Sequence, residues 1–308
     1  MTSEPAFIDL LRAIATDPAA RGLQDDTAVL AIGQQHLVLT KDMLAEGVHF
    51  LADDPPADIA WKLVAVNVSD LAAKGATPLA CLMGYTLTGD AAWDSGFVQG
   101  LREALDHYGM LLIGGDTVSI TPGAPRTISL TAIGIPSVPV PPSRSGALEG
   151  DALFVTGPIG NGWAGLQLLQ DGKTEPQALI AAYRRPVALV AQGRALAQVA
   201  RAMMDISDGL LIDAMRMAQA SGFGVTMDLA RVPLSPDFIS CFGDDQDAVV
   251  SAATGGDDYQ LLFAADPQAH LPVDAHRIGT LTPEPGLALR WNGTPVAIPD
   301  RLGWLHGQ

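Results

Sequence analysis

Short apolar runs alternate with stretches of helical periodicity along most of the chain. In the first part the runs HLVLT, LACLMGYTL, GMLLIGG and RTISLTAIG are typical of strands, and the spans near 58–75 and 94–108 are typical of helices. The alternation then returns, with strands predicted at DALFVTG, ARAMMDI, GVTMDL and YQLLFAA and helices from about 162, near 186–200 and at 208–220. This order predicts an α/β (α+β) chain of two layered domains.

A proline-dense segment divides the two series of elements. Four prolines fall within residues 136–142, in GIPSVPVPPSRSG, a density that helices and central strands do not tolerate. A length of 308 residues is enough for two compact domains. We therefore predict an N-terminal domain over residues 1–138 and a C-terminal domain over residues 139–308.

Charge and composition narrow the class of protein. The chain has 34 acidic residues against 18 lysines and arginines, a net charge of -16, which disfavours binding to nucleic acid or to an anionic membrane. Cys81 and Cys241 form no C-x-x-C motif, so neither a zinc site nor a disulfide framework is indicated. No apolar run approaches 18 residues and the N-terminus has no basic region, so we expect a cytoplasmic protein outside the membrane.

One glycine motif is a weak candidate for nucleotide binding. GNGWAG, residues 160–165, satisfies G-x-G-x-x-G after a predicted strand. A dinucleotide site also needs an acidic residue about 20 positions later, and Asp171 and Glu175 come too early. The phosphate-loop and protein-kinase motifs are absent from the sequence. The motif alone therefore does not indicate a dinucleotide enzyme.

The aspartates are more informative, because several stand where a strand gives way to a loop or helix. Aspartate suits turns and helix caps, but short carboxylates on rigid segments also hold divalent cations. Asp70 illustrates both interpretations, since Asn67, Asp70 and Lys74 share one face of a largely apolar helix. This polar stripe is either solvated or lines a cleft in which the carboxylate meets a cation.

The segment DISDGLLIDAMRMAQASG combines a helix start with further carboxylates. Ser207 or Asp208 is expected to cap the helix, which leaves Asp205 unexplained. A helix N-terminus attracts phosphate, whereas the aspartates repel it, and a bridging magnesium ion would resolve that conflict. We therefore predict an acidic rim, including Asp25 and Asp26, that binds metal-loaded polyphosphate.

Seven sequence blocks carry a resemblance to a known family. In this order, QDDTAVL, LTKDMLAEGVHF, AVNVSDLAAKGATP, LIGGDTVS, SRSGALEGDALFVTG, DISDGLLIDA and GGDDYQLLF resemble the thiamine-monophosphate kinase family, over nearly the whole chain. The resemblance implies the two-domain aminoimidazole ribonucleotide synthetase-like fold, with an N-terminal mixed sheet with helices and a C-terminal α/β domain. It also implies a homodimer formed through the N-terminal domains, with ATP and several Mg2+ ions in a cleft.

The implied reaction is direct transfer of the ATP γ-phosphoryl group to thiamine monophosphate, giving thiamine diphosphate and ADP. Such a transfer needs alignment and charge neutralisation rather than a covalent nucleophile, and the sequence offers no convincing nucleophile. The resemblance implies Mg2+ ligands at Asp26, Thr40, Asp42, Asp70, Asp116, Asp205 and Asp208, ATP contacts at Gly115, Asp116, Arg144 and Ser207, and substrate contacts at His49, Asp257 and Trp304.

Three positions depart from the family's pattern. Gln24 replaces a glycine, Lys41 replaces a small hydroxyl residue, and Asp257 replaces a glutamate one methylene longer. Lys41 is expected either to displace one magnesium ion or to pair with a phosphate. Two alternatives remain open: an ATP-using synthetase or maturation protein of the same superfamily, which would release free phosphate, and a nucleotide-binding protein without turnover.

Overall fold

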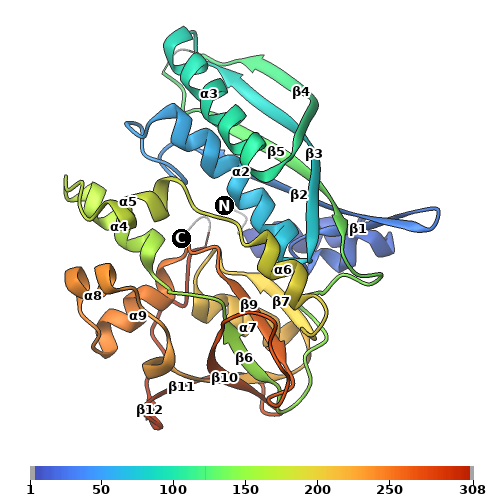
Figure 1. The fold of residues 1–308 in the computed structure, drawn as a ribbon, viewed down its shortest axis with the longest axis vertical. Coiled ribbons are helices and arrows are strands. Elements are labelled where there is room, and N and C mark those ends of the chain that lie inside the picture. Colours follow the sequence, from blue (N-terminus) through green and yellow to red (C-terminus); the bar gives the residue numbers. More distant parts are fainter. Residues whose placement is uncertain (1–3, 122, 306–308) are drawn as a thin grey trace.

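The computed structural model describes residues 4–121 and 123–305, which form two sheets that follow one another along the chain (Figure 1). The first sheet has the order β1-β2-β5-β3-β4, with β3 and β4 parallel and the other neighbours antiparallel. Its strands are β1 (Ala28–Ile32), β2 (Gln35–Ala45), β3 (Ala76–Leu87), β4 (Leu111–Ser119) and β5 (Thr127–Pro136).

Helices α2 (Pro56–Ala73) and α3 (Ala91–Tyr108) pack on one face of this sheet. Most of the 18 residues of α2 are buried, because the helix also touches β7 and α6 of the second half of the chain (Figure 1). A helix that is apolar around most of its circumference is buried on all sides. The central helix therefore joins the two halves, and its few polar residues lie between them.

The opposite face of the first sheet is uncovered in the single chain. All nine residues of β4 are exposed, although the strand contains Leu111, Ile113 and Val118. Met43 on β2 and Leu82 on β3 are also more than 40% exposed. Large contiguous apolar surfaces of this kind mark interaction sites.

The second sheet has the order β12-β11-β8-β10-β6-β9-β7 and is antiparallel except between β8 and β11. Apolar side chains of its strands and of the helices around it form one large core. The strands are β6 (Ala152–Val155), β7 (Ala202–Asp205), β8 (Gly224–Asp228), β9 (Leu261–Ala265), β10 (His276–Thr282), β11 (Gly286–Trp291) and β12 (Thr294–Val296).

The remaining helices are short. In chain order they are α1 (Glu4–Arg12), α4 (Asn161–Gln170), α5 (Gln177–Arg184), α6 (Val190–Leu196), α7 (Leu210–Ala220), α8 (Pro236–Phe242) and α9 (Gln246–Gly255), with short 3-10 turns at Pro18–Leu23 and Leu229–Arg231. None of the helices within 4–121 and 123–305 is both long and apolar enough to cross a membrane.

The predicted strands are confirmed, and so are the helices near 58–75, 94–108, 162 and 208–220. The helix predicted near 186–200 is also present but is shorter than predicted, since α6 runs only from Val190 to Leu196. Residues 186–189 are not helical. The mixed sheets with packed helices confirm the predicted α/β (α+β) fold class.

Candidate active site

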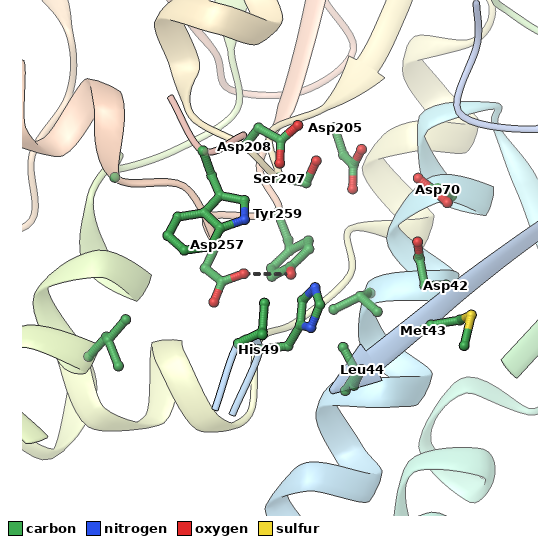
Figure 2. Close-up of a pocket in the computed structure, with 15 residues that line it drawn as sticks. Asp42, Met43, Leu44, His49, Asp70, Asp205, Ser207, Asp208, Asp257 and Tyr259 are labelled. Atoms are coloured by element: carbon green, nitrogen blue, oxygen red, sulfur yellow. Dashed lines mark hydrogen bonds between the residues drawn. The ribbon is translucent and has the colours of Figure 1, made fainter. Parts of the chain in front are cut away.

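A cavity of about 200 Å3 opens between the two halves of the molecule, and both halves supply its walls. Figure 2 shows Asp42, Asp70, Asp205 and Asp208 on one side of it and His49, Asp257 and Tyr259 on the other. The carboxylates come from β2, from α2, from the last residue of β7 and from the turn after it. The buried helix α2 thus brings an N-terminal carboxylate against two C-terminal ones.

Three carboxylates form the tightest group. Asp26, Asp70 and Asp205 each place an oxygen within 4.8 Å of the other two. Thr40 Oγ1 donates a hydrogen bond to Asp70 Oδ2, and Ser69 Oγ donates to Asp205 Oδ2 at 2.6 Å. These hydroxyl groups fix the orientation of two of the three carboxylates.

The protonation of these carboxylates reflects their surroundings. Burial, followed by the charges of Asp26 and Asp208, raises the pKa of Asp42 to about 6. Burial and the charge of Asp26 raise the pKa of Asp205 to about 8. Burial and three neighbouring carboxylates place the pKa of Asp70 well above its usual value. The raised pKa values show that these carboxylates repel one another when ionised. Mg2+ prefers carboxylate oxygens as ligands, so the residues fit a magnesium site.

Cations hold the other side of Asp26. The side chains of Asp25 and Asp26 are 2% and 1% exposed, and Lys74 Nζ contacts both carboxylates. Arg144 Nε donates to Asp26 Oδ1 at 2.7 Å, and Arg21 Nη1 donates to Asp25 Oδ2 at 2.5 Å. Burial alone would raise the pKa of Asp25, but the ammonium of Lys74, a hydrogen bond from Ser143 and the charge of Arg21 together hold the pKa below its usual range. The two adjacent aspartates of the sequence thus lie in ion pairs with basic side chains.

The polar stripe on α2 is not solvated. Asn67 and Lys74 are fully buried, and Asp70 lines the cavity. Asn67 Oδ1 accepts a hydrogen bond from the backbone N–H of Asp42 at 3.0 Å, which ties β2 to the helix. Of the two interpretations of this stripe, the solvated one is wrong, and Asp70 is the member of the stripe that lines the cavity.

The expected cap of the helix at 208–220 is wrong. The cap position is Gly209, and the Oδ2 atom of Asp213 accepts from the backbone N–H groups of Ser207, Asp208 and Gly209 at 3.1–3.3 Å. Arg216 in turn contacts Asp208 and Asp213. A carboxylate within the helix therefore accepts from the amide groups of the turn that precedes the helix.

Opposite the aspartates, a second polar group surrounds Asp257. Lys62 Nζ lies 2.6 Å from Asp257 Oδ2 and donates to the carbonyl oxygen of His49 at 3.1 Å. Tyr259 Oη donates to Asp257 Oδ1 at 2.8 Å (Figure 2). His49 Nδ1 accepts from the N–H of Ala45, and Lys62 is itself buried. The loop and α2 thereby fix His49 and Asp257 at the same end of the cavity.

Trp304 completes this end. Its backbone N–H donates to the carbonyl oxygen of Asp208 at 2.8 Å, and its side chain lines the cavity while 41% exposed. The guanidinium of Arg301 lies 5.0 Å from its ring centroid. The C-terminal segment therefore carries an aromatic ring to the mouth of the cavity.

Two predicted residues do not join this group within one chain. Asp116 lies in register with Gly84, Ser129 and Met43, whereas Asp42 lies in register with Leu130. Because neighbouring residues of a strand point to opposite faces, Asp116 lies on the uncovered face of the sheet and Asp42 on the α2 face. Three strand spacings of about 4.8 Å also separate β4 from β2, about 14 Å in all.

Gly115 has a structural reason to be glycine. Its φ is +156°, and a Cβ atom there would lie 2.0 Å from the carbonyl oxygen of Met83. Lys41 also belongs to the uncovered face, where its Nζ donates to Ser129 Oγ at 3.1 Å. It therefore points away from the three-carboxylate group and does not displace an ion there.

The GNGWAG segment begins α4, and its helix N-terminus is occupied. Asp258 Oδ1 accepts from the backbone N–H of Gly160 at 2.8 Å, and a Cβ on Gly162 would lie 2.2 Å from the carbonyl oxygen of Asp257. These glycines allow close packing under the cavity rather than dinucleotide binding.

Several residues of the site were not predicted from the sequence. They are Lys62, Ser69, Asp213, Arg216 and Tyr259 as neighbours of the predicted residues, and Lys74 as a partner of the paired aspartates. Only Lys74 gave a signal, because it shares the polar stripe with Asp70. The contacts of Lys62 with Asp257 and of Ser69 with Asp205 depend on how the two halves meet.

Comparison with known proteins agrees with this architecture. The N-terminal domain model of the AIR synthase related proteins matches residues 24–136, and the C-terminal domain model matches residues 149–292. The two matches together define the chain as an AIR synthase related protein.

Individual relatives narrow the family. Thiamine-monophosphate kinase of Caulobacter vibrioides is 39% identical over 94% of this chain and 86% of its own length, and that of Escherichia coli K12 is 37% identical over 97% and 95%. A solved structure described as "AaThiL complexed with AMPPCP and TMP" superposes with a TM-score of 0.88 at 32% identity, covering 99% of this chain and 97% of that one. The chain belongs to the thiamine-monophosphate kinase family.

Proposed function

We propose that this protein transfers the γ-phosphoryl group of ATP directly to the phosphate of thiamine monophosphate, giving thiamine diphosphate and ADP. The observation that carries the proposal is the cavity itself, with the Asp70 and Asp205 carboxylates at one end and His49, Asp257 and Trp304 at the other. The buried Asp26 places an oxygen within 4.8 Å of oxygens of Asp70 and Asp205. Family membership supports the same reaction.

The acidic end is proposed to bind Mg2+ and the nucleotide phosphates. The ligands proposed for Mg2+ in one chain are Asp26, Thr40, Asp42, Asp70, Asp205 and Asp208. Bound Mg2+ would neutralise the charge on the phosphates of two anionic substrates. Arg144, now paired with Asp26, would turn to a nucleotide phosphate, which its planar guanidinium binds in a bidentate manner. Ser207 lies near Asp205 and Asp208 at the acidic end of the cavity (Figure 2).

The other end is proposed to hold thiamine monophosphate. The thiazolium ring of thiamine is positively charged, which suits the aromatic face of Trp304 and the carboxylate of Asp257. Lys62 and Tyr259 hold that carboxylate in place. The acceptor is a phosphate that is already largely ionised at neutral pH, so no general base is required. The protein's task is to align the two phosphates and exclude water.

We also propose a homodimer formed through the uncovered face of the first sheet. Met43, Leu82 and Val118 are 42–53% exposed there, and a second copy would bury them. Asp116 lies on this face. Asp116 of the partner subunit is then proposed to complete the nucleotide site, together with Gly115 of the partner subunit.

The domain roles follow from these assignments. We propose that residues 1–138 bind ATP and Mg2+ and dimerise, and that residues 139–308 complete the cleft. We also propose a cytoplasmic location, since Cys81 and Cys241 are both free thiols.

The direct test is a product assay. The purified protein is incubated with Mg-ATP and thiamine monophosphate, thiamine esters are separated by chromatography, and ADP and free phosphate are measured. We expect thiamine diphosphate equal to ADP, abolished by EDTA. Asp70→Asn should remove turnover, whereas Asp171→Asn, at a 65% exposed side chain, should not. Free phosphate without thiamine diphosphate would indicate a synthetase, and bound ATP without ADP a non-catalytic protein.

A further inference from the structure

Lys74 is a fully buried cation inside the acidic cluster. Its Nζ lies 2.6 Å from Asp25 Oδ1, contacts Asp26 Oδ2 and donates to the carbonyl oxygen of Met203 at 3.0 Å. These bonds use all three donors of an ammonium group. The side chain therefore has no proton left for a substrate, and its role must be exerted through its neighbours.

The partners of this ammonium are those that a divalent cation takes. Two carboxylates and a backbone carbonyl are hard oxygen donors of the kind that bind Mg2+ and Ca2+. Asp26 is shared between the ammonium and the three-carboxylate group, because one of its oxygens lies within 4.8 Å of oxygens of Asp70 and Asp205. The ammonium thus lies at the inner end of one continuous group of carboxylates.

The backbone holds the ammonium in place. Lys74 is the C-cap residue of α2, where the helix dipole favours a positive charge. The chain turns sharply at Gly75, whose φ is +60° and whose Cβ would lie 2.4 Å from Ala197 Cβ. Burying an ammonium is costly unless it is fully paired, so this cation is a fixed feature of the folded chain.

We propose that the Lys74 ammonium is a built-in cation that takes the place of one divalent metal ion in the acidic cluster. It neutralises Asp25 and Asp26 from the inner side and leaves Asp26 oriented toward Asp70 and Asp205. Lys74 is therefore a positioning residue. The inference rests on the proposed metal site, and it implies that the carboxylates would bind one more divalent ion if the ammonium were removed.

The test compares Mn2+ binding by the metal-free full chain and by Lys74→Met, a neutral side chain of similar length. Bound Mn2+ is counted by titration calorimetry and by the electron paramagnetic resonance signal of free Mn2+. We expect Lys74→Met to bind one equivalent more than the original chain and its Tm to rise at least twice as much on adding Mn2+. The double variant Asp25→Asn, Lys74→Met removes one negative charge with the ammonium, so it should return to the original stoichiometry.

The failures are distinguishable. Equal stoichiometry and equal Tm responses in Lys74→Met and the original chain would overturn the role of Lys74 while leaving the metal site intact. No Mn2+ binding by any of the proteins would overturn both. If both variants stayed unfolded even with Mn2+, an ion would be unable to replace the ammonium, and the inference would again be overturned.

Discussion

Replacing Asp205 by asparagine should stabilise the metal-free protein at neutral pH, although it removes a proposed metal ligand. Asp205 is 2% exposed, and burial with the charge of Asp26 raises its pKa from 3.8 to about 8. In the unfolded chain the same group loses its proton near pH 4. The folded state therefore binds more protons than the unfolded state between about pH 4 and pH 8, and its stability falls as the pH rises through that window.

The magnitude follows from the size of the shift. One pKa unit corresponds to about 1.4 kcal/mol, and pH 7 lies about three units above the unfolded value, so the group costs up to about 4 kcal/mol at pH 7. Asparagine has the shape of the protonated carboxyl and can still accept the hydrogen bond from Ser69. We expect Asp205→Asn to raise the free energy of unfolding by about 1 to 4 kcal/mol at pH 7, and the gain to vanish near pH 4.

The assay is urea unfolding followed by tryptophan fluorescence, at pH 5 and pH 7, in EDTA and in Mg2+. Mg2+ should stabilise the original chain by mass action and Asp205→Asn much less. Asp171→Asn, at an exposed position on α4's C-cap, serves as the control and should match the original chain. The reasoning would be refuted if Asp205→Asn in EDTA were less stable at pH 7 with an unchanged dependence on pH, or if Mg2+ stabilised it as much as the original chain.

Three other substitutions test separate parts of the model. Trp304→Ala should raise KM for thiamine monophosphate about tenfold but leave KM for ATP and Tm nearly unchanged, because the ring is 41% exposed; a selective rise in KM for ATP would contradict this. Lys62→Met should destabilise the fold by about 3 kcal/mol in urea, because it leaves Asp257 without its ammonium partner, and an unchanged midpoint would argue against the pair. Leu82→Asp, on the uncovered sheet face, should halve the mass measured by light scattering, and an unchanged dimer mass would place the interface elsewhere.

The sequence predicted most of the fold because its periodicities are local. The apolar runs of β2, β3 and β5 and the buried face of α7 are confirmed by the structure. The helix predicted near 186–200 is confirmed only over the shorter range of α6. Strands β10 to β12, by contrast, are short mixed segments that carry little periodic signal. Their pairing depends on β8 and on contacts distant in the chain.

The residues of the candidate site were likewise predicted only where the signal is local in the sequence. Helix geometry alone predicted that Asn67, Asp70 and Lys74 share one face. The other aspartates were assigned to the metal site from the resemblance to the family. The pairing of Lys62 with Asp257 spans 195 positions, so no local pattern could reveal it. The role of Asp213 was missed because serine is a usual capping residue, whereas the amide of Ser207 donates to this carboxylate within the helix.

Asp116 shows what one chain leaves incomplete. Resemblance groups it with the aspartates of the cavity, yet the strand register places it on the far face of the sheet, beside Lys41 and Ser129. No side-chain rotation carries a β4 carboxylate through a sheet and across three strand spacings of about 4.8 Å. If Asp116 serves the nucleotide site, it must do so in another subunit. In that case the apolar surface around Asp116 has a catalytic role as well, because the subunit contact that buries Leu82 and Met43 would also bring the Asp116 carboxylate to the nucleotide site of the other subunit. Leu82→Asp should then abolish both dimerisation and turnover. Asp116→Asn should abolish turnover and leave the dimer intact.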